Sequence, residues 1–160
     1  MKAQLQTIDL PGRDPLTLRH LALDLNGTVA LDGRLLPGVA ERMALLRDRL
    51  DIYLLTADTH GQGAATADQL GIQLHRLVPG REAEQKADFV HRLGAAHTVA
   101  VGNGANDALM LSVAGLGIAV LGHEGLALPA LQAADLVVPD IAAALDLLLH
   151  PKRLIATLRR

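Results

Sequence analysis

Short apolar runs alternate with helix-like segments along most of this chain, and this alternation restricts the fold more than any other feature. Apolar runs typical of buried strands occur at 20–25, 51–55, 72–78, 98–101, 116–121 and 136–138. Segments with helical features follow them, at 37–50, 62–70, 81–93, 106–114, 125–133 and 141–149. Because the connections are short, the pattern predicts βαβ units and an α/β fold with a parallel sheet.

Smaller elements flank this pattern. Residues 1–18 predict an N-terminal hairpin that turns at 11–15, and residues 29–36 predict a small flap that turns at Asp32-Gly33. Residues 1–150 are expected to form a single domain. Pro151 is expected to separate this domain from a basic C-terminal tail, 151–160, which is predicted to be a solvated or partner-facing helix.

Composition excludes several classes of protein. The 160 residues are 50% hydrophobic, which suits one domain with a sizeable core. The formal net charge of −2 shows no basic excess, so no nucleic-acid partner is expected. The chain has no cysteine and no apolar stretch near the ~20 residues of a membrane span, and its first residues do not resemble a signal peptide. A cytoplasmic protein without a membrane span is therefore predicted.

Two of the predicted strands end in polar loops that contain glycine. Leu-Asp-Leu-Asn-Gly-Thr occupies 23–28, and Gly-Asn-Gly-Ala-Asn-Asp occupies 102–107. Ligands of open parallel sheets bind outside the carboxyl ends of the strands. Asp24 would therefore extend a carboxylate into a crevice that Asp107 approaches from the other loop.

Four residues in these and two further segments resemble a known superfamily. Asp24 and Thr56 each end a predicted strand, Lys86 lies near the start of a helix, and Asp107 follows the fourth strand. This order resembles the haloacid dehalogenase superfamily over roughly residues 19–150. Leu-Thr-Ala-Asp at 55–58 and the loop at 102–107 are most similar to soluble P-type-ATPase-like members. The resemblance implies a Rossmann-like core of strand order 3-2-1-4-5, with the site beside the first strand.

The resemblance also implies phosphohydrolase or phosphoryl-transfer chemistry. Asp24 would attack phosphorus and form an aspartyl-phosphate. Asn26, Thr56 and Lys86 complete the implied catalytic set. The implied Mg²⁺ ligands are Asp24, Asn26, Asn103 and Asp107. The phosphate-binding residues would be Gly27, Thr28, Thr56, Ala57 and Lys86.

Two amides depart from the motifs of hydrolytic members. Asn26 and Asn103 both stand where those members carry Asp. An amide is neither a general acid nor a general base, and losing such a group costs about 10²–10⁴ in rate. Asn103 offers Mg²⁺ an oxygen without charge. Slow turnover and weakly bound Mg²⁺ are therefore expected. The alternative is a catalytically impaired binding or regulatory module of the same fold.

Each site residue also has a purely structural interpretation. Asp24 could cap a turn, Thr56 could be a satisfied strand-end hydroxyl, and Asp107 could stabilise the start of a helix. Lys86 follows Glu82 by four residues, so the two could form a surface ion pair.

The intervals between the motifs are too short for a cap domain. Residues 29–51 hold only the flap and one helix, and 71–79 are equally short. A capless site is open, so it suits a large phosphorylated substrate or needs a neighbouring subunit to cover it. A homo-oligomer is therefore expected.

Overall fold

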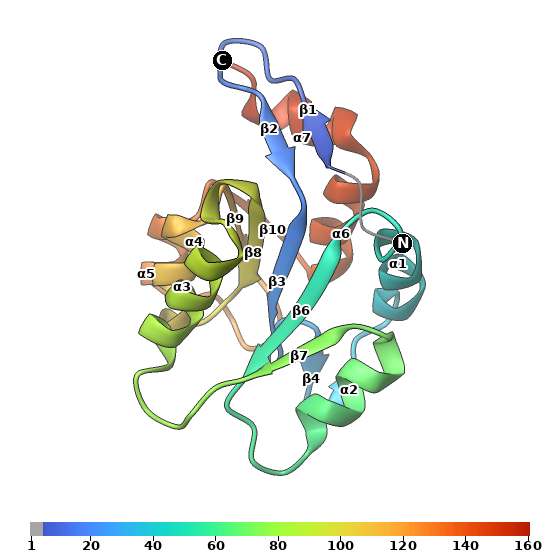
Figure 1. Cartoon of the computed structure of the whole chain (residues 1–160), viewed down its shortest axis with the longest axis vertical. Coiled ribbons are helices and arrows are strands. Elements are labelled where there is room, and N and C mark those ends of the chain that lie inside the picture. The colour runs from blue at the N-terminus through green and yellow to red at the C-terminus, as the bar shows by residue number, and fades with distance from the viewer. Residues whose placement is uncertain (1–4) are drawn as a thin grey trace.

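The computed structural model describes residues 5–160, and its centre is a six-stranded parallel sheet (Figure 1). The strands are β3 (His20–Asp24), β6 (Asp51–Thr56), β7 (Gln73–Arg76), β8 (Thr98–Gly102), β9 (Leu116–Val120) and β10 (Leu136–Val138). They lie in the order β10-β9-β8-β3-β6-β7. Counted along the chain, the first five have the predicted order 3-2-1-4-5, which is confirmed. The sixth extends the sheet beside β9.

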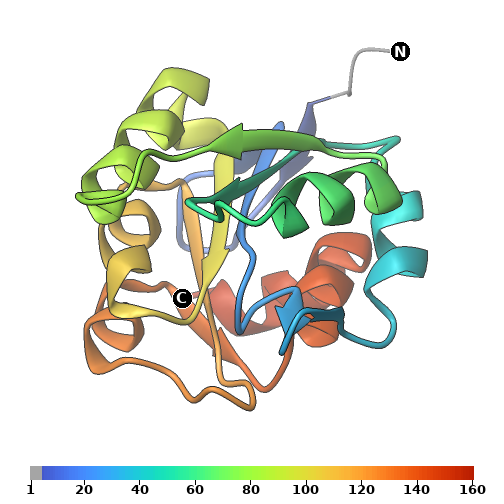
Figure 2. The ribbon, with the colours of Figure 1, turned by 90° about the horizontal axis from the view of Figure 1, so that it is seen from below.

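Helices cover both faces of the sheet, so the molecule has three layers (Figures 1 and 2). One face carries α3 (Glu82–Leu93), α4 (Ala108–Val113) and α5 (Leu128–Ala133). The other face carries α1 (Val39–Leu46), α2 (Gln62–Leu70), α6 (Ile141–Leu149) and α7 (Pro151–Leu158). Short 3-10 turns at 95–97 and 105–107 precede β8 and α4.

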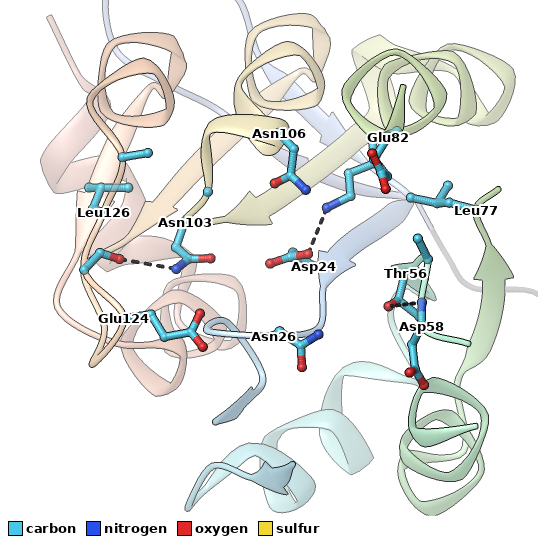
Figure 3. Close-up of a pocket in the computed structure, with 15 residues that line it drawn as sticks. Asp24, Asn26, Thr56, Asp58, Leu77, Glu82, Asn103, Asn106, Glu124 and Leu126 are labelled. Carbon is cyan, nitrogen blue, oxygen red and sulfur yellow. Dashed lines mark hydrogen bonds and ion pairs between the residues drawn. The ribbon is translucent and has the colours of Figure 1, made fainter. Parts of the chain in front are cut away.

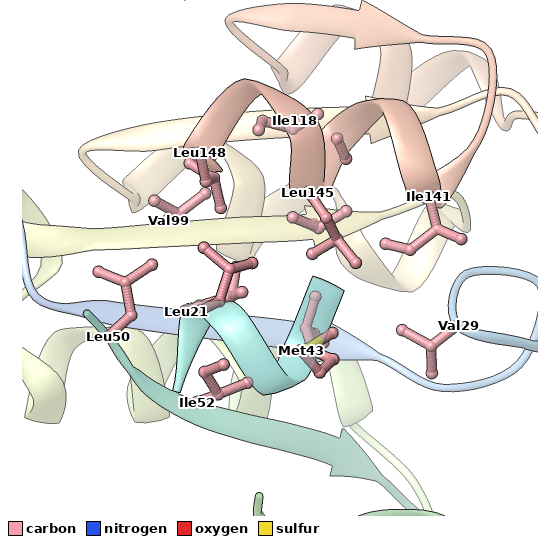
Figure 4. Close-up of a cluster of buried hydrophobic side chains, with 14 of the residues drawn as sticks. Leu21, Val29, Met43, Leu50, Ile52, Val99, Ile118, Ile141, Leu145 and Leu148 are labelled. Atoms are coloured by element: carbon pink, nitrogen blue, oxygen red, sulfur yellow. The ribbon is translucent and has the colours of Figure 1, made fainter. Parts of the chain in front are cut away.

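Alternating side chains of the central strands supply both halves of the core. Leu21 and Leu23 of β3 point to the face that α1 and α6 cover, while Ala22 points to the α3 and α4 face. Figure 4 shows the larger cluster, in which Leu145 and Leu148 of α6 pack over the sheet. Burying each such leucine contributes roughly 1.5–3 kcal/mol to stability. This layer of large aliphatic side chains fixes the positions of the strand ends that carry the site.

Both small predicted hairpins are present. β1 (Gln6–Ile8) pairs antiparallel with β2 (Leu16–Leu18), and the first four residues of the predicted hairpin lie outside the described residues. The flap consists of β4 (Ala30–Leu31) and β5 (Arg34–Leu35). It turns at Asp32-Gly33, where both residues have positive φ, of 50° and 80°.

Several predicted elements are shorter than expected. The helix predicted over 37–50 is α1, which ends at Leu46, although Leu50 is still buried. The helix predicted over 106–114 is a 3-10 turn followed by α4. The helix predicted over 125–133 begins only at Leu128, because the chain first turns at Gly125 with φ 81°. The third strand narrows to 73–76.

The C-terminal segment was predicted to be a solvated or partner-facing helix, and the structure has the helix but packs it into the core. Residues 151–158 form α7, whose Leu154 and Leu158 are 0% and 7% exposed and belong to the larger core cluster. The Arg160 N–H also donates to the Pro11 carbonyl in the turn of the β1–β2 hairpin. The amphipathic pattern of α7 places its basic residues outside and its leucines inside, so this helix is part of the core.

The connections at the carboxyl edge of the sheet contain no cap domain within residues 5–160. The chain passes from β3 to β6 through the flap and α1 alone. None of the described helices has the length and apolarity needed to span a bilayer.

Candidate active site

Asp24 stands at the carboxyl end of β3, at the point where the direction of strand order reverses. β3 lies between β6 and β8, and Leu23 pairs with Val101, the residue before the end of β8. This is the switch point at which open parallel sheets bind ligands. The Asp24 side chain is 14% exposed, so the sheet holds it while one side stays accessible.

Lys86 is a buried cation that pairs with Asp24. It extends from α3, is 2% exposed, and donates to Asp24 Oδ1 at 2.8 Å and to Asp107 Oδ1 at 2.7 Å. Burial alone would lower the pKa of Lys86, but the two carboxylates outweigh burial and raise the pKa. The helical spacing between Glu82 and Lys86 had left a surface ion pair open, and the structure replaces it with this buried contact.

Asp107 holds the other side of the lysine. It is fully buried, and its Oδ2 accepts hydrogen bonds from the backbone N–H groups of Asn103 and Gly104. A Cβ on Gly102 would lie 2.5 Å from the Asp107 carboxylate, so only glycine allows this approach. Asp107 therefore ties the loop after β8 to Lys86.

The environment of Asp24 disfavours its charge. Burial, followed by the nearby Asp107 carboxylate, raises the pKa of Asp24 to about 6. Lys86 and the Thr28 hydroxyl oppose this shift by donating hydrogen bonds. An aspartate held in this way is weakly hydrated, which favours its use as a nucleophile once it is ionised.

Thr28 links the two polar loops. Its hydroxyl is fully buried and lies within hydrogen-bond distance of Asp24 Oδ2, at 3.2 Å, and of Asn103 Oδ1, at 3.3 Å. The Asn103 side-chain amide donates in turn to the Gly125 carbonyl at 3.3 Å. Thr28 thus orients the free side of the Asp24 carboxylate.

A cavity of about 770 Å³ opens in front of Asp24 (Figure 3). Thr56 and Asp58 form one wall, and Asn103 and Glu124 form the facing wall. The Thr56 hydroxyl accepts a hydrogen bond from the Asp58 N–H at 3.1 Å. The cavity is lined by Asp24, Asn26, Thr56, Ala57, Asp58, Leu77, Glu82, Lys86, Asn103, Gly104, Asn106, Glu124, Gly125, Leu126 and Ala127.

The structure brings together most residues that the sequence predicted. The predicted residues on the cavity wall are Asp24, Asn26, Thr56, Ala57, Lys86 and Asn103. Gly27, Thr28 and Asp107 do not line the cavity and lie behind it. Three acidic side chains on the wall were missed, namely Asp58, Glu82 and Glu124. Asp58 belongs to the quoted Leu-Thr-Ala-Asp segment and could have been noticed, whereas no spacing rule indicates Glu124.

The oxygen donors around Asp24 suit a hard divalent cation but carry little charge. Within residues 5–160, no group of three or more His, Cys, Asp or Glu side chains is arranged to hold a metal. The available donors are the Asp24 carboxylate and oxygens of Asn26 and Asn103, a set compatible with Mg²⁺.

Comparison with known proteins agrees with this geometry. A family model described as haloacid dehalogenase-like hydrolase matches residues 2–115. The chain belongs to the haloacid dehalogenase-like hydrolases. This membership confirms the resemblance inferred from Asp24, Thr56, Lys86 and Asp107.

Similar sequences include cation pumps of this fold. The chain is 52% identical over 61 residues to the uncharacterized protein MJ0073 of Methanocaldococcus jannaschii, covering 38% of this chain and 66% of that protein. It is 41% identical over 99 residues to the probable cation-transporting ATPase G of Mycobacterium tuberculosis. That match covers 60% of this chain but only 12% of the ATPase. The chain therefore corresponds to a small part of the pump.

Solved structures of two phosphatases share the fold. The cobalt-bound deoxy-D-mannose-octulosonate 8-phosphate phosphatase of Haemophilus influenzae has a TM-score of 0.69 at 16% identity, and the match covers 85% of this chain and 90% of the phosphatase. The Moraxella catarrhalis phosphatase, solved with magnesium and phosphate, has a TM-score of 0.66 at 17% identity, covering 88% and 92%. At these identities the likeness establishes the fold alone.

Proposed function

We propose that this haloacid dehalogenase-like hydrolase is a Mg²⁺-dependent phosphohydrolase or phosphoryl-transfer protein that forms an aspartyl-phosphate on Asp24. One observation carries the proposal. The Asp24 carboxylate is oriented by Thr28, paired with Lys86 at 2.8 Å, and open on its remaining side to the cavity. A nucleophile needs this combination of fixed orientation and access.

The cavity offers a cationic and hydrogen-bonding environment for a phosphoryl group. The Lys86 ammonium would neutralise phosphate charge, and the Thr56 hydroxyl would donate to a phosphate oxygen. Of the predicted backbone donors, the N–H of Ala57 is proposed to complete this binding, because the N–H groups of Gly27 and Thr28 already donate to the carbonyls of Ala30 and Leu25. The buried position of Lys86 strengthens the attraction, because the local dielectric constant is lower than in water.

Mg²⁺ would be held by the carboxylate of Asp24 and by oxygens of Asn26 and Asn103. Asp107 would hold the loop that carries Asn103. A bound Mg²⁺ would polarise the phosphoryl group and neutralise its charge. Because Asp107 already accepts from Lys86 and from two backbone N–H groups, we expect it to contribute mainly by positioning these groups. Weak affinity for Mg²⁺ follows from a donor set with few charges.

The test is hydrolysis of p-nitrophenyl phosphate with Mg²⁺, run beside Asp24→Asn. We expect slow, Mg²⁺-dependent turnover in the wild type and none in the variant. Acid-quenched protein should carry one added phosphoryl group, which peptide mapping should locate at Asp24. Equal rates in both proteins would reject Asp24 as the nucleophile.

A binding or regulatory module is the second candidate, favoured by the amides at 26 and 103. These amides leave the site without a group of three metal-binding acids in the described part of the chain. Such a module would bind phosphate or beryllofluoride at the same cavity, visible by calorimetry, and would show no phosphorylated Asp24 and no turnover.

A further inference from the structure

Three carboxylates on the cavity wall have no role in the chemistry described above. Asp58 is occupied by backbone N–H groups at the start of α2, and Glu82 lies in the first turn of α3, across the cavity from Asn26 (Figure 3). Asp58 accepts from the N–H groups of His60 and Gly63, and these bonds lower its pKa. The pKa of Glu82 is lowered by backbone hydrogen bonds at Glu82 itself and Gly80. Both groups therefore stabilise the chain locally.

Glu124 differs from Asp58, because no side-chain hydrogen bond or ion pair holds the Glu124 carboxylate within residues 5–160. The residue is exposed, lies on the loop after β9, and lines the cavity on the wall shared with Asn103, near Asn26 (Figure 3). Its Oε2 occupies the space in which a Cβ on Gly27 would stand. The carboxylate thus reaches the backbone directly beside Asn26, the position that lacks an acid.

Asn103 holds the Glu124 loop in this place. Its side-chain Nδ2 donates to the Gly125 carbonyl, and its backbone carbonyl accepts from the Ala127 N–H at 2.9 Å. An ionised aspartate at position 103 could not donate to a carbonyl. The side-chain amide of Asn103 therefore fixes Gly125 and its backbone carbonyl fixes Ala127, both of which follow Glu124 in the loop that brings this carboxylate to the cavity.

Glycine at position 27 is required for this approach. A Cβ there would collide with the Glu124 carboxylate and lie 2.7 Å from Asn103 Nδ2. Gly27 also has a φ of 76°, a conformation that side chains disfavour. The loop at 23–28 thus leaves space for the carboxylate of Glu124, which lies on the loop after β9.

We propose that Glu124 is the general acid and general base of the reaction, in place of the carboxylate that position 26 lacks. This inference rests on the proposed phosphoryl transfer through Asp24. The Glu124 carboxylate is exposed and is not held by backbone N–H groups, so it can turn toward a substrate in the cavity, whereas two N–H groups fix Asp58. Acid–base catalysis of this kind contributes about 10²–10⁴ in rate.

The two steps balance with Glu124 alone as proton carrier. In the first, an Asp24 oxygen bonds to phosphorus, the bond from phosphorus to the leaving oxygen breaks, and that oxygen takes the Glu124 proton. In the second, a water oxygen bonds to phosphorus, the bond from phosphorus to Asp24 breaks, and the water proton passes to Glu124. The products are an alcohol, inorganic phosphate and the starting carboxylate of Asp24.

The experiment compares substrates with different leaving groups. Nitrophenolate leaves readily without a proton, whereas the leaving oxygen of phenyl phosphate needs one. In Glu124→Gln, we expect turnover of phenyl phosphate to fall by about 10²-fold or more, within the usual range for a lost acid–base group. Phosphorylation of Asp24 by p-nitrophenyl phosphate should change little, and the phosphorylated protein should accumulate because its hydrolysis lacks a base. Glu41→Gln, at an exposed site on α1, is the matched control.

Restoring an acid elsewhere provides an independent check. Asn26→Asp added to Glu124→Gln should recover phenyl phosphate turnover and remove the accumulated intermediate. If Glu124→Gln keeps the wild-type rates on both substrates, the role of Glu124 is overturned while the function of Asp24 stands. If the wild type never phosphorylates Asp24 with either substrate, the proposed function fails, and this inference fails with it.

Discussion

At the scale of single residues, the site depends on a buried lysine between two carboxylates. Asp24, Lys86 and Asp107 come from three separate segments, and the Lys86 ammonium compensates both carboxylates. Removing one partner of a buried charge pair is costly because the remaining charge stays buried without compensation. The arrangement therefore stabilises the fold as well as the proposed chemistry.

Lys86→Met should destabilise the protein by about 3–5 kcal/mol, since it leaves two buried carboxylates without their cation. The free energy of unfolding, measured by urea denaturation at neutral pH, tests this. Lys152→Met on the exposed face of α7 is the matched control and should leave stability nearly unchanged. A loss below 1 kcal/mol for Lys86→Met would contradict the buried pairing.

Asn26→Asp should raise hydrolysis of phenyl phosphate by about 10²-fold in the Glu124→Gln background, and by much less where Glu124 already supplies the acid–base group. The added carboxylate would lie on the cavity wall and serve as a second acid–base group beside Glu124. Steady-state kinetics with Mg²⁺ measure the effect, with circular dichroism to verify the fold. A variant that folds, binds Mg²⁺ and gains no rate would favour the binding module.

At the scale of elements, α7 shows how an amphipathic helix with many charges can still belong to the core. Its leucines pack inward, and its end is tied to the hairpin turn through Arg160 and Pro11. Pro151 is the first residue of this helix and follows the end of α6, because proline is well suited to a first helical turn.

Leu154→Ala should therefore cost about 2–5 kcal/mol, the range for truncating a fully buried leucine. Thr157→Ala, at an exposed position of the same helix, should change stability by less than about 0.5 kcal/mol. Thermal unfolding of both variants decides the matter. Equal midpoints would mean that α7 does not contribute to the cooperative core.

At the scale of the whole molecule, a single sheet joins two cores of different character. Large aliphatic side chains fill the face under α1 and α6, whereas alanines of β3 and β8 allow α3 and α4 to lie close. The few aromatic rings gather at one edge, where His75 stacks on Phe89 with centroids 3.9 Å apart.

The contribution of two histidines to stability should fall as the pH drops below about 6.5, against an opposite contribution from Asp24, whose raised pKa favours the folded state as that carboxyl is protonated. Burial, aided by Arg92, lowers the pKa of His75, and burial also lowers the pKa of His20 against the opposing effect of Asp51. The unfolded chain then binds protons that the folded chain resists, so the contribution is complete above pH 6.5 and is lost below it. Each histidine adds at most about 1.4 kcal/mol per pH unit.

Melting temperatures at pH 7.5 and 5.5 test this dependence. His75→Phe, which keeps a ring on Phe89, should reduce the difference between the two pH values. His60→Gln, at an exposed position, should not reduce it. An unchanged pH dependence in His75→Phe would exclude His75 as a source.

A homo-oligomer remains a prediction, because the site is open and the sheet edges expose backbone groups. Val137 of edge strand β10 is 43% exposed, and Leu121 after β9 is 54% exposed. Multi-angle light scattering should give a dimer or tetramer. A monomer at high protein concentration would rule this out.

The alternation of apolar runs and helical segments was sufficient to predict the parallel sheet. The motifs that resemble the haloacid dehalogenase superfamily were sufficient to predict that Asp24, Thr56 and Lys86 share one site. These features are local, since strand period, helix spacing and loop residues are readable from neighbouring positions. Only the tertiary structure showed that α7 is buried, that Lys86 bridges Asp24 and Asp107, and that Glu124 reaches the space beside Gly27. Each of these depends on which distant segments pack together. The sequence shows which side chains favour burial, but hydrophobic burial is not directional, so the sequence does not show which segments they will contact.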